Sequence, residues 1–252
     1  MTKETKKYWE SSSPYYQGEA KIPIGVHYGP GAPFENKLKL LGKLKGKNVL
    51  EIGCGGAQCG IAMAKQGAKV IGIDISEEQL KFAKALAEKN KVKIKFYQGD
   101  IRKLPQIKSS SQDLVFTAWA LLYVDNLKSC FNEVYRVLKK NGTFVAAFPH
   151  PFYEILDPKK LRLKQSYFKT GNGKYENIEV WPDKSRHKFV CYHHTISELT
   201  NLFLDTGFSI EKMIEPDSRK HYPKDPWYNL WGFSSKSMKY APPTLIYKVR
   251  KD

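Results

Sequence analysis

Three acidic residues that follow or interrupt short apolar runs are the strongest candidates for chemistry in this sequence. Glu51 lies inside the run 49–52, Asp74 ends a second run, and Asp100 follows a third. A carboxylate placed like Asp74, about 20 residues beyond a glycine-rich turn, can accept hydrogen bonds from ribose hydroxyls. Asp100, at the next strand end, is placed to accept from an adenine amino group. The three residues together predict a site for a polar ligand of nucleotide size.

The glycine-rich turn itself, Gly53-Cys54-Gly55-Gly56, comes directly after the first apolar run. Glycine has no Cβ, so a ligand can approach the backbone closely, and the helix expected next presents free N–H groups to it. The dinucleotide pattern G-x-G-x-x-G is incomplete, because its last position falls on Gln58. The three carboxylates strengthen the prediction of a ligand site at this turn. All three fall at the carboxyl edge of a predicted parallel sheet, where open α/β folds bind ligands.

Apolar runs alternate with stretches of helical periodicity, and this alternation predicts the elements that position the site. We expect strands at 49–52, 69–73, 92–98, 113–118, 143–148, 208–214 and 245–249, and helices at 59–65, 76–89, 127–138 and 195–207. Ser76 and Thr195 begin capping-box patterns, and Asn141-Gly142 is expected to stop the third helix. The order predicts an α/β fold with a Rossmann-like, doubly wound, mostly parallel sheet.

These motifs resemble those of the class I S-adenosylmethionine-dependent methyltransferases. The similarity runs from Lys47 to about Phe148 and rests on five segments that are specific only in combination. They are Val49-Leu50-Glu51-Ile52-Gly53-Cys54-Gly55-Gly56, Gly72-Ile73-Asp74-Ile75-Ser76, Gln98-Gly99-Asp100-Ile101, Asp113-Leu114-Val115-Phe116 and Leu138-Lys139-Lys140-Asn141-Gly142. Ala57 departs from the family pattern, which often has a third glycine there.

The resemblance implies that S-adenosyl-L-methionine is the cofactor and assigns residues to each part of it. Gly53, Cys54 and Gly55 would hold the methionine moiety, and Glu51 would orient the loop or its water. For the remaining contacts the resemblance implies Asp74 for ribose, Ile75 as packing on adenine, Asp100 and Ile101 for adenine selection, and Ala118 and Trp119 for the amino-acid end. Gln79 is left with two interpretations, a ribose contact or a role in capping its helix.

Two segments lie outside the alternating pattern. Residues 1–45 are rich in aromatic residues, have no clean periodicity and include one possible short helix at 34–44. We interpret this arm either as a lid over the ligand or as a strap along the sheet. Residues 149–194 are polar, aromatic and lysine-rich, and we expect short strands or helices that form a substrate cap inserted into the methyltransferase domain, 46–252.

The residues that act on the methyl acceptor are harder to identify. His150 follows the fifth strand and is a candidate general base for an oxygen acceptor, with a structural, hydrogen-bonded histidine as the alternative. His193 and His194 precede a capped helix, and His194 is the second catalytic candidate. The sequence has no metal-ligand spacing, and it lacks the Asn-Pro-Pro-Tyr and Asp-Pro-Pro-Tyr motifs that mark amino-group methylation of bases or glutamine.

Composition limits the partners of the protein. The net charge of +17 is compatible with RNA binding, but only six of the 42 basic residues are arginine and the lysines are spread along the chain, so a solvated surface is the preferred interpretation. The four scattered cysteines and the absence of a long apolar run or signal peptide predict a cytoplasmic protein without membrane association. We therefore predict methylation of a small molecule at oxygen or nitrogen, with RNA methylation, or S-adenosylmethionine binding without turnover, as alternatives. The oligomeric state is not predicted.

Overall fold

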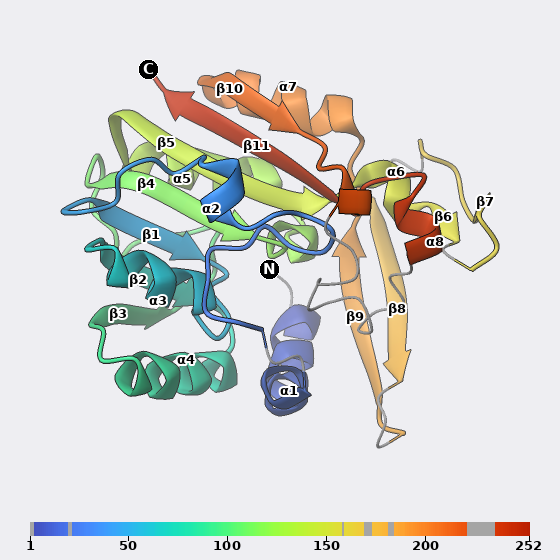
Figure 1. Cartoon of the computed structure of the whole chain (residues 1–252), viewed down its shortest axis with the longest axis horizontal. Helices are drawn as coiled ribbons and strands as arrows, with labels where there is room; N and C mark the ends of the chain where they lie inside the picture. Colours follow the sequence, from blue (N-terminus) through green and yellow to red (C-terminus); the bar gives the residue numbers. More distant parts are fainter. Residues whose placement is uncertain (1–2, 20–21, 158, 169–172, 181–183, 221–234) are drawn as a thin grey trace.

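The computed structural model describes residues 3–19, 22–157, 159–168, 173–180, 184–220 and 235–252, and it is built around one seven-stranded sheet (Figure 1). The strand order is β10-β11-β5-β4-β1-β2-β3. Four neighbouring pairs are parallel, while β11 runs antiparallel to both β5 and β10. The sheet strands are β1 (Asn48–Ile52), β2 (Lys69–Asp74), β3 (Ile94–Gln98), β4 (Gln112–Ala118), β5 (Leu138–Pro149), β10 (Phe208–Ile214) and β11 (Thr244–Lys251). The predicted fold class and all seven predicted strands are confirmed.

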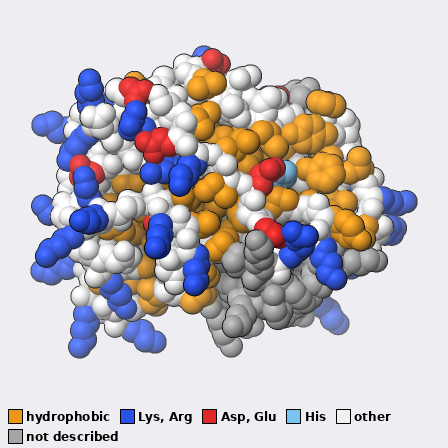
Figure 2. All heavy atoms as spheres, turned by 45° about the horizontal axis from the view of Figure 1, so that its top comes forward, with side chains coloured by type: hydrophobic (Ala, Val, Ile, Leu, Met, Phe, Trp, Pro, Cys, Tyr) orange, Lys and Arg blue, Asp and Glu red, His pale blue; other side chains and the backbone are white. Residues whose placement is uncertain are grey.

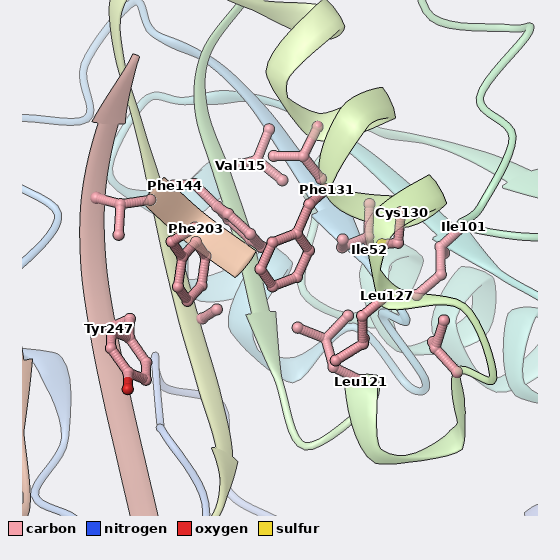
Figure 3. Close-up of a cluster of buried hydrophobic side chains, with 14 of the residues drawn as sticks. Ile52, Ile101, Val115, Leu121, Leu127, Cys130, Phe131, Phe144, Phe203 and Tyr247 are labelled. Carbon is pink, nitrogen blue, oxygen red and sulfur yellow. The ribbon is translucent and has the colours of Figure 1, made fainter. Parts of the chain in front are cut away.

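Helices cover both faces of the sheet because successive strand residues point to opposite sides. In β1, Leu50 and Ile52 belong to one hydrophobic core, whereas Val49 belongs to the other. The first core includes α5 (Leu127–Val137) and α7 (Ile196–Thr206), where the Phe131 and Phe203 rings stack with centroids 4.4 Å apart (Figure 3). The second core contains α3 (Gln58–Lys65), and α4 (Glu77–Lys89) packs beside α3.

The N-terminal arm is more ordered than the sequence predicted and divides into two parts. Residues Lys3–Glu19 form a helix, α1, although Pro14 and three serines lower its helix propensity. Helix α1 packs between α4 and strand β9 (Arg186–Tyr192) (Figure 1). Tertiary contacts therefore stabilise a helix that local sequence does not favour, and the sequence analysis did not predict this helix.

The second part of the arm, residues 22–44, is a strap that packs into the second core. Tyr28 is fully buried, and its hydroxyl donates to the Glu35 carboxylate, which also accepts from the amides of Leu40 (3.0 Å) and Leu41 (2.7 Å). These bonds end the helix early: α2 spans only Glu35–Leu38, and Lys39 adopts a left-handed conformation with φ of 52°. The predicted helix at 34–44 was therefore too long.

The fifth strand begins earlier than predicted. Helix α5 ends at Val137, and β5 starts at Leu138, so Asn141-Gly142 lies within the strand instead of stopping the helix. Asn141 has a positive φ of 60°, and the pairing of β4 with β5 shifts register between Gln112 and Leu114. The Asn-Gly pair thus marks an irregularity within the strand. An Asn-Gly pair is also typical of the end of a helix, and this is why the sequence pattern was misinterpreted.

The segment after β5 forms several small elements, as expected. They are α6 (Pro151–Glu154), the short pair β6 (Leu156–Asp157) and β7 (Arg162–Leu163), and a hairpin of β8 (Lys174–Val180) with β9. The 3-10 turns η1 (Leu121–Tyr123) and η2 (Ser218–Lys220) and helix α8 (Ser235–Met238) complete the described elements. Among them, no helix is long and apolar enough to span a bilayer.

Candidate cofactor site

A cavity of about 870 Å³, counting the space open to solvent, lies at the carboxyl ends of β1, β2 and β4. Ten of the eleven residues predicted to contact the cofactor line it: Glu51, Gly53, Cys54, Gly55, Asp74, Ile75, Gln79, Ile101, Ala118 and Trp119. The parallel register of β1, β2 and β4 brings these strand ends together. The cavity is therefore where the sequence predicted it, while the contact assigned to each residue stays a prediction.

Asp74 holds the glycine loop in place. Its Oδ2 accepts from the Gly55 amide at 2.8 Å, and its Oδ1 accepts from the Ser76 amide at 2.9 Å. Gly55 has a φ of +51°, a conformation that side chains disfavour. Burial raises the Asp74 pKa to about 6, although the two amides act in the opposite direction. The carboxylate thus links the loop to the N-terminus of α4 and also faces the cavity.

Glu51 brings a buried carboxylate to the floor of the cavity. It is 5% exposed, and its Oε2 has no hydrogen-bond partner among the described residues. Burial raises its pKa to about 8. A Cβ at Gly60 would lie 2.5 Å from Oε2, so a larger residue there would require the Glu51 side chain to shift. An unpaired buried carboxylate oxygen is costly unless a ligand pairs with it, so the residue fits the ammonium group of the cofactor.

Three glutamine side chains join α1 to the glycine loop. Gln58 donates to Gln17 at 2.8 Å, and Gln17 donates to Gln79 at 2.7 Å. A Cβ at Gly56 would come within 2.5 Å of the Gln17 side-chain oxygen, so a larger residue there would displace the Gln17 side chain. The Ser76 side chain caps α4 by accepting from the backbone N–H of Gln79. The Gln79 side chain takes no part in this cap and lies in the cavity wall. This arrangement favours a ligand-facing role for Gln79.

Helix α1 is held on two sides above the cavity. On one side the Glu10 carboxylate accepts from the Glu77 and Glu78 amides, at 3.0 and 3.2 Å, at the N-terminus of α4. On the other side the Tyr8 hydroxyl donates to Glu179 on β8 at 2.6 Å. Trp9, Tyr16 and Gln17 of α1 line the cavity. Their spacing of seven and eight residues places them on one helix face, a signal that could have revealed the helix from sequence.

We expect α1 to act as a lid that opens and closes over the cofactor. Amide hydrogen exchange of residues 3–18 should slow when S-adenosylhomocysteine binds. In the ligand-free protein, Glu10→Gln should speed this exchange by about 2- to 5-fold, since a carboxylate at a helix N-terminus contributes about 0.3–1 kcal/mol. Lys7→Gln, at an exposed position on the same helix, is the control. Equal exchange with and without ligand would leave α1 as a fixed part of the wall.

Asp100 is the one predicted cofactor residue that lies outside the cavity lining. It pairs with Arg102 at 2.6 Å, and Arg102 also pairs with Asp125 at 2.7 Å. Burial raises the Asp100 pKa, hydrogen bonds from Arg102 are among the contacts that lower it, and the net value is about 2. The predicted adenine contact of Asp100 therefore needs a direct test.

The two predicted catalytic histidines also lie outside the cavity lining. His150 is buried, contacts Glu215 through Nε2 at 2.7 Å and accepts from the Phe152 amide through Nδ1. These bonds favour its structural alternative, the N-cap of α6. His194 lines a separate, smaller cavity with Tyr192 and Glu154. Neither arrangement places an imidazole beside the predicted methionine site.

His27, on the strap, is the histidine that does line the cavity, together with Gln58 and Tyr123. The sequence marked His27 only as part of an aromatic-rich arm, because nothing local indicated that the strap returns to the glycine loop. The residues that the structure describes contain no cluster of three or more His, Cys, Asp or Glu suited to a metal ion.

Comparison with known proteins agrees with this geometry. A family model described as a methyltransferase domain matches residues 43–207. An uncharacterised protein of Haemophilus influenzae is 28% identical over 85% of each chain. A ubiquinone biosynthesis O-methyltransferase of Rickettsia canadensis is 27% identical over 66% of this chain and 64% of its own. The crystal structure of an S-adenosylmethionine-dependent methyltransferase from Mesorhizobium loti superposes with a TM-score of 0.62 at 21% identity, covering 85% of this chain and 95% of that one. The chain belongs to the methyltransferase domain family and has the fold of the class I S-adenosylmethionine-dependent enzymes.

Proposed function

We propose that this S-adenosylmethionine-dependent methyltransferase methylates an oxygen or nitrogen atom of a small molecule that enters the cavity beneath α1. One observation carries the proposal: the cavity is covered by a helix and lined by Trp9, Tyr16 and Tyr123. A covered aromatic pocket suits a compact acceptor better than a polymer.

Aromatic side chains of α1 and η1 line the side of the cavity that the lid covers. Trp9 makes edge contacts with Tyr16 and Tyr123, with ring centroids 5.4 and 5.5 Å apart. Tyr8 lies against Phe189 of β9 at 5.2 Å, so the hairpin supports this cluster from outside. Such rings orient a planar or apolar acceptor and attract a cation at their faces.

Catalysis here requires mainly alignment and exclusion of water. The cofactor supplies an electrophilic methyl group carried on a sulfonium, so the protein need not form a covalent intermediate with the acceptor. The glycine loop and Asp74 fix one side of the site, and the α1 rings close the other. None of the described residues in 149–194 lines the cavity. We infer that this cap acts on acceptor choice through α1, which it holds by the Tyr8–Glu179 and Ser11–His187 contacts.

The names of relatives are consistent with a small acceptor. The Rickettsia protein is a ubiquinone biosynthesis O-methyltransferase, and a Pneumocystis carinii relative is named as a sterol 24-C-methyltransferase. These names belong to those proteins, and they differ in the atom that receives the methyl group. They support the class of acceptor but not its identity.

RNA methylation remains the alternative because of the net charge of +17. On the face shown in Figure 2, lysine and arginine side chains are spread widely and interspersed with acidic ones. The described residues that line the cavity include no lysine or arginine to meet a phosphate. Both observations favour a solvated basic surface.

Labelled methyl transfer into cell extract tests these functions against one another. With labelled S-adenosylmethionine we expect the label in the small-molecule fraction and no loss of signal after nuclease treatment. RNA affinity should be weak and fall steeply between low and physiological salt, because it rests on counterion release alone. Label in nuclease-sensitive material would support RNA methylation. Tight cofactor binding with no labelled product in any fraction would support a binding protein without turnover.

A further inference from the structure

The described residues that line the cavity carry little positive charge to pair with the carboxylate of S-adenosylmethionine. The lining includes two carboxylates, Glu51 and Asp74, and the described lining residues include no lysine or arginine. The cofactor carries an ammonium and a carboxylate at its amino-acid end. Glu51 can pair with the ammonium, whereas among the lining residues only His27 can carry a positive charge for the carboxylate.

His27 is fixed beside the first turn of α3. Its backbone carbonyl accepts from the Cys59 thiol, with Sγ at 3.8 Å, and Cys59 is the second residue of that helix. The N-cap residue of the helix is Ala57, which offers no side-chain cap, and the Gly60 amide of the first turn donates to the Glu51 carboxylate. Gln58 and Cys59 of this turn line the same cavity as His27. The partial positive charge of a helix N-terminus and an imidazole that can be protonated both favour an anion in this part of the cavity.

We propose that His27, which lies beside the first turn of α3, binds the carboxylate of the cofactor's methionine moiety and takes up a proton as the carboxylate enters. The inference concerns the cofactor alone and does not depend on which acceptor is methylated. It assigns to the strap, residues 22–44, a direct part in cofactor binding.

The protonation states of the empty cavity agree with this assignment. Burial lowers the His27 pKa to about 4, so the ring is neutral near pH 7 until an anion approaches. Burial raises the Glu51 pKa to about 8, so that carboxyl holds a proton until a cation approaches. Other titratable groups lining the cavity are Asp74 of β2, Cys54 of the loop, Cys59 of α3, Tyr16 of α1 and Tyr123 of η1. The cofactor would therefore cause Glu51 to release one proton and His27 to gain one, with almost no net exchange.

Calorimetry with two ligands tests the assignment. S-adenosylhomocysteine has the complete amino-acid end, whereas 5′-methylthioadenosine lacks both its carboxylate and its ammonium. His27→Gln should weaken S-adenosylhomocysteine binding by about 10- to 100-fold, the effect of losing a hydrogen bond to a charged group. It should leave 5′-methylthioadenosine affinity within about twofold. An equal loss for both ligands, or no loss for either, would overturn the proposal.

Proton counting gives a second readout that depends on charge and not on packing. In buffers of different ionisation enthalpy near pH 7, S-adenosylhomocysteine binding by the unaltered protein should exchange almost no protons. The same titration of His27→Gln should release nearly one proton, because Glu51 still ionises. A histidine NMR titration of the unaltered protein needs no variant: the His27 pKa should rise by about four units or more in the complex, so that the ring is protonated near pH 7. An unchanged His27 pKa on saturation would refute the assignment.

Discussion

Asp74→Ala should weaken S-adenosylhomocysteine binding by about 10- to 150-fold, equivalent to about 1.5–3 kcal/mol. The carboxylate faces the cavity and also accepts from the Gly55 and Ser76 amides, so its removal deletes a ligand contact and releases the loop. Isothermal titration calorimetry measures the loss directly. Below about pH 6 the unaltered protein should bind more weakly as well, because Asp74 becomes protonated there.

Asp100→Ala is the matched control for this experiment. Asp100 also ends a strand at the same edge of the sheet, but it is paired with Arg102 outside the cavity lining. We expect its replacement to change the affinity by no more than about threefold. If Asp100→Ala lost as much affinity as Asp74→Ala, the adenine contact suggested by the sequence would be right and the Arg102 pair would have to open on binding. If Asp74→Ala bound normally, the ribose assignment would be wrong.

The central sheet was predictable because its signals are local. Strands β1, β2 and β4 are mostly buried and therefore appear as nearly continuous apolar runs, and the runs of β1 and β2 end at Gly53 and Asp74. The glycine loop and Asp74 followed from their position at those strand ends, and Gln79 followed from the family resemblance, with helix capping as the alternative. Parallel pairing of β1 with β2 and β4 places the carboxyl ends of these strands side by side. The residues predicted at those ends therefore line one cavity.

Features that depend on distant contacts were not predictable in the same way. Helix α1 is stabilised by Glu10 at the start of α4 and by Tyr8 at Glu179, partners 67 and 171 residues away. His27 reaches the glycine loop because Glu35 folds the strap back on itself through Tyr28 and two amides. The Asp100–Arg102–Asp125 network is likewise tertiary. The sequence shows that these residues are acidic, basic or aromatic. It does not show where they lie, because their positions depend on contacts with residues far away in the chain.

The ligand-free protein should lose about 2 kcal/mol of unfolding free energy between about pH 6.5 and 8.5 because of Glu51 alone. The Glu51 pKa rises from 4.5 to about 8 on folding, mainly through burial. Between these values the native state keeps a proton that the unfolded chain has released, so stability falls as pH rises and levels off above pH 8. The slope is about 1.4 kcal/mol per pH unit within this window.

Glu51→Gln should abolish this dependence, and urea denaturation at both pH values measures it. His193, whose pKa is raised overall because its bonds to Glu154 outweigh the effect of burial, loses stabilisation in the same range. The relevant quantity is therefore the difference between the unaltered protein and the variant. Glu88→Gln, at an exposed position on α4, should keep the full dependence. The same slope in Glu51→Gln as in the unaltered protein would show that Glu51 is ionised before any ligand binds.

The same substitution should weaken cofactor binding while it stabilises the free protein. An amide in place of the carboxylate removes the cost of a buried charge, but it leaves the ammonium of S-adenosylhomocysteine with a neutral partner. We expect the affinity near pH 8.5 to fall by about 10- to 150-fold, the effect of losing a hydrogen bond between charged groups. Stability and affinity changing in opposite directions would identify Glu51 as a residue kept for its ligand. A variant that gained stability and bound the ligand unchanged would instead show that the ammonium is held elsewhere.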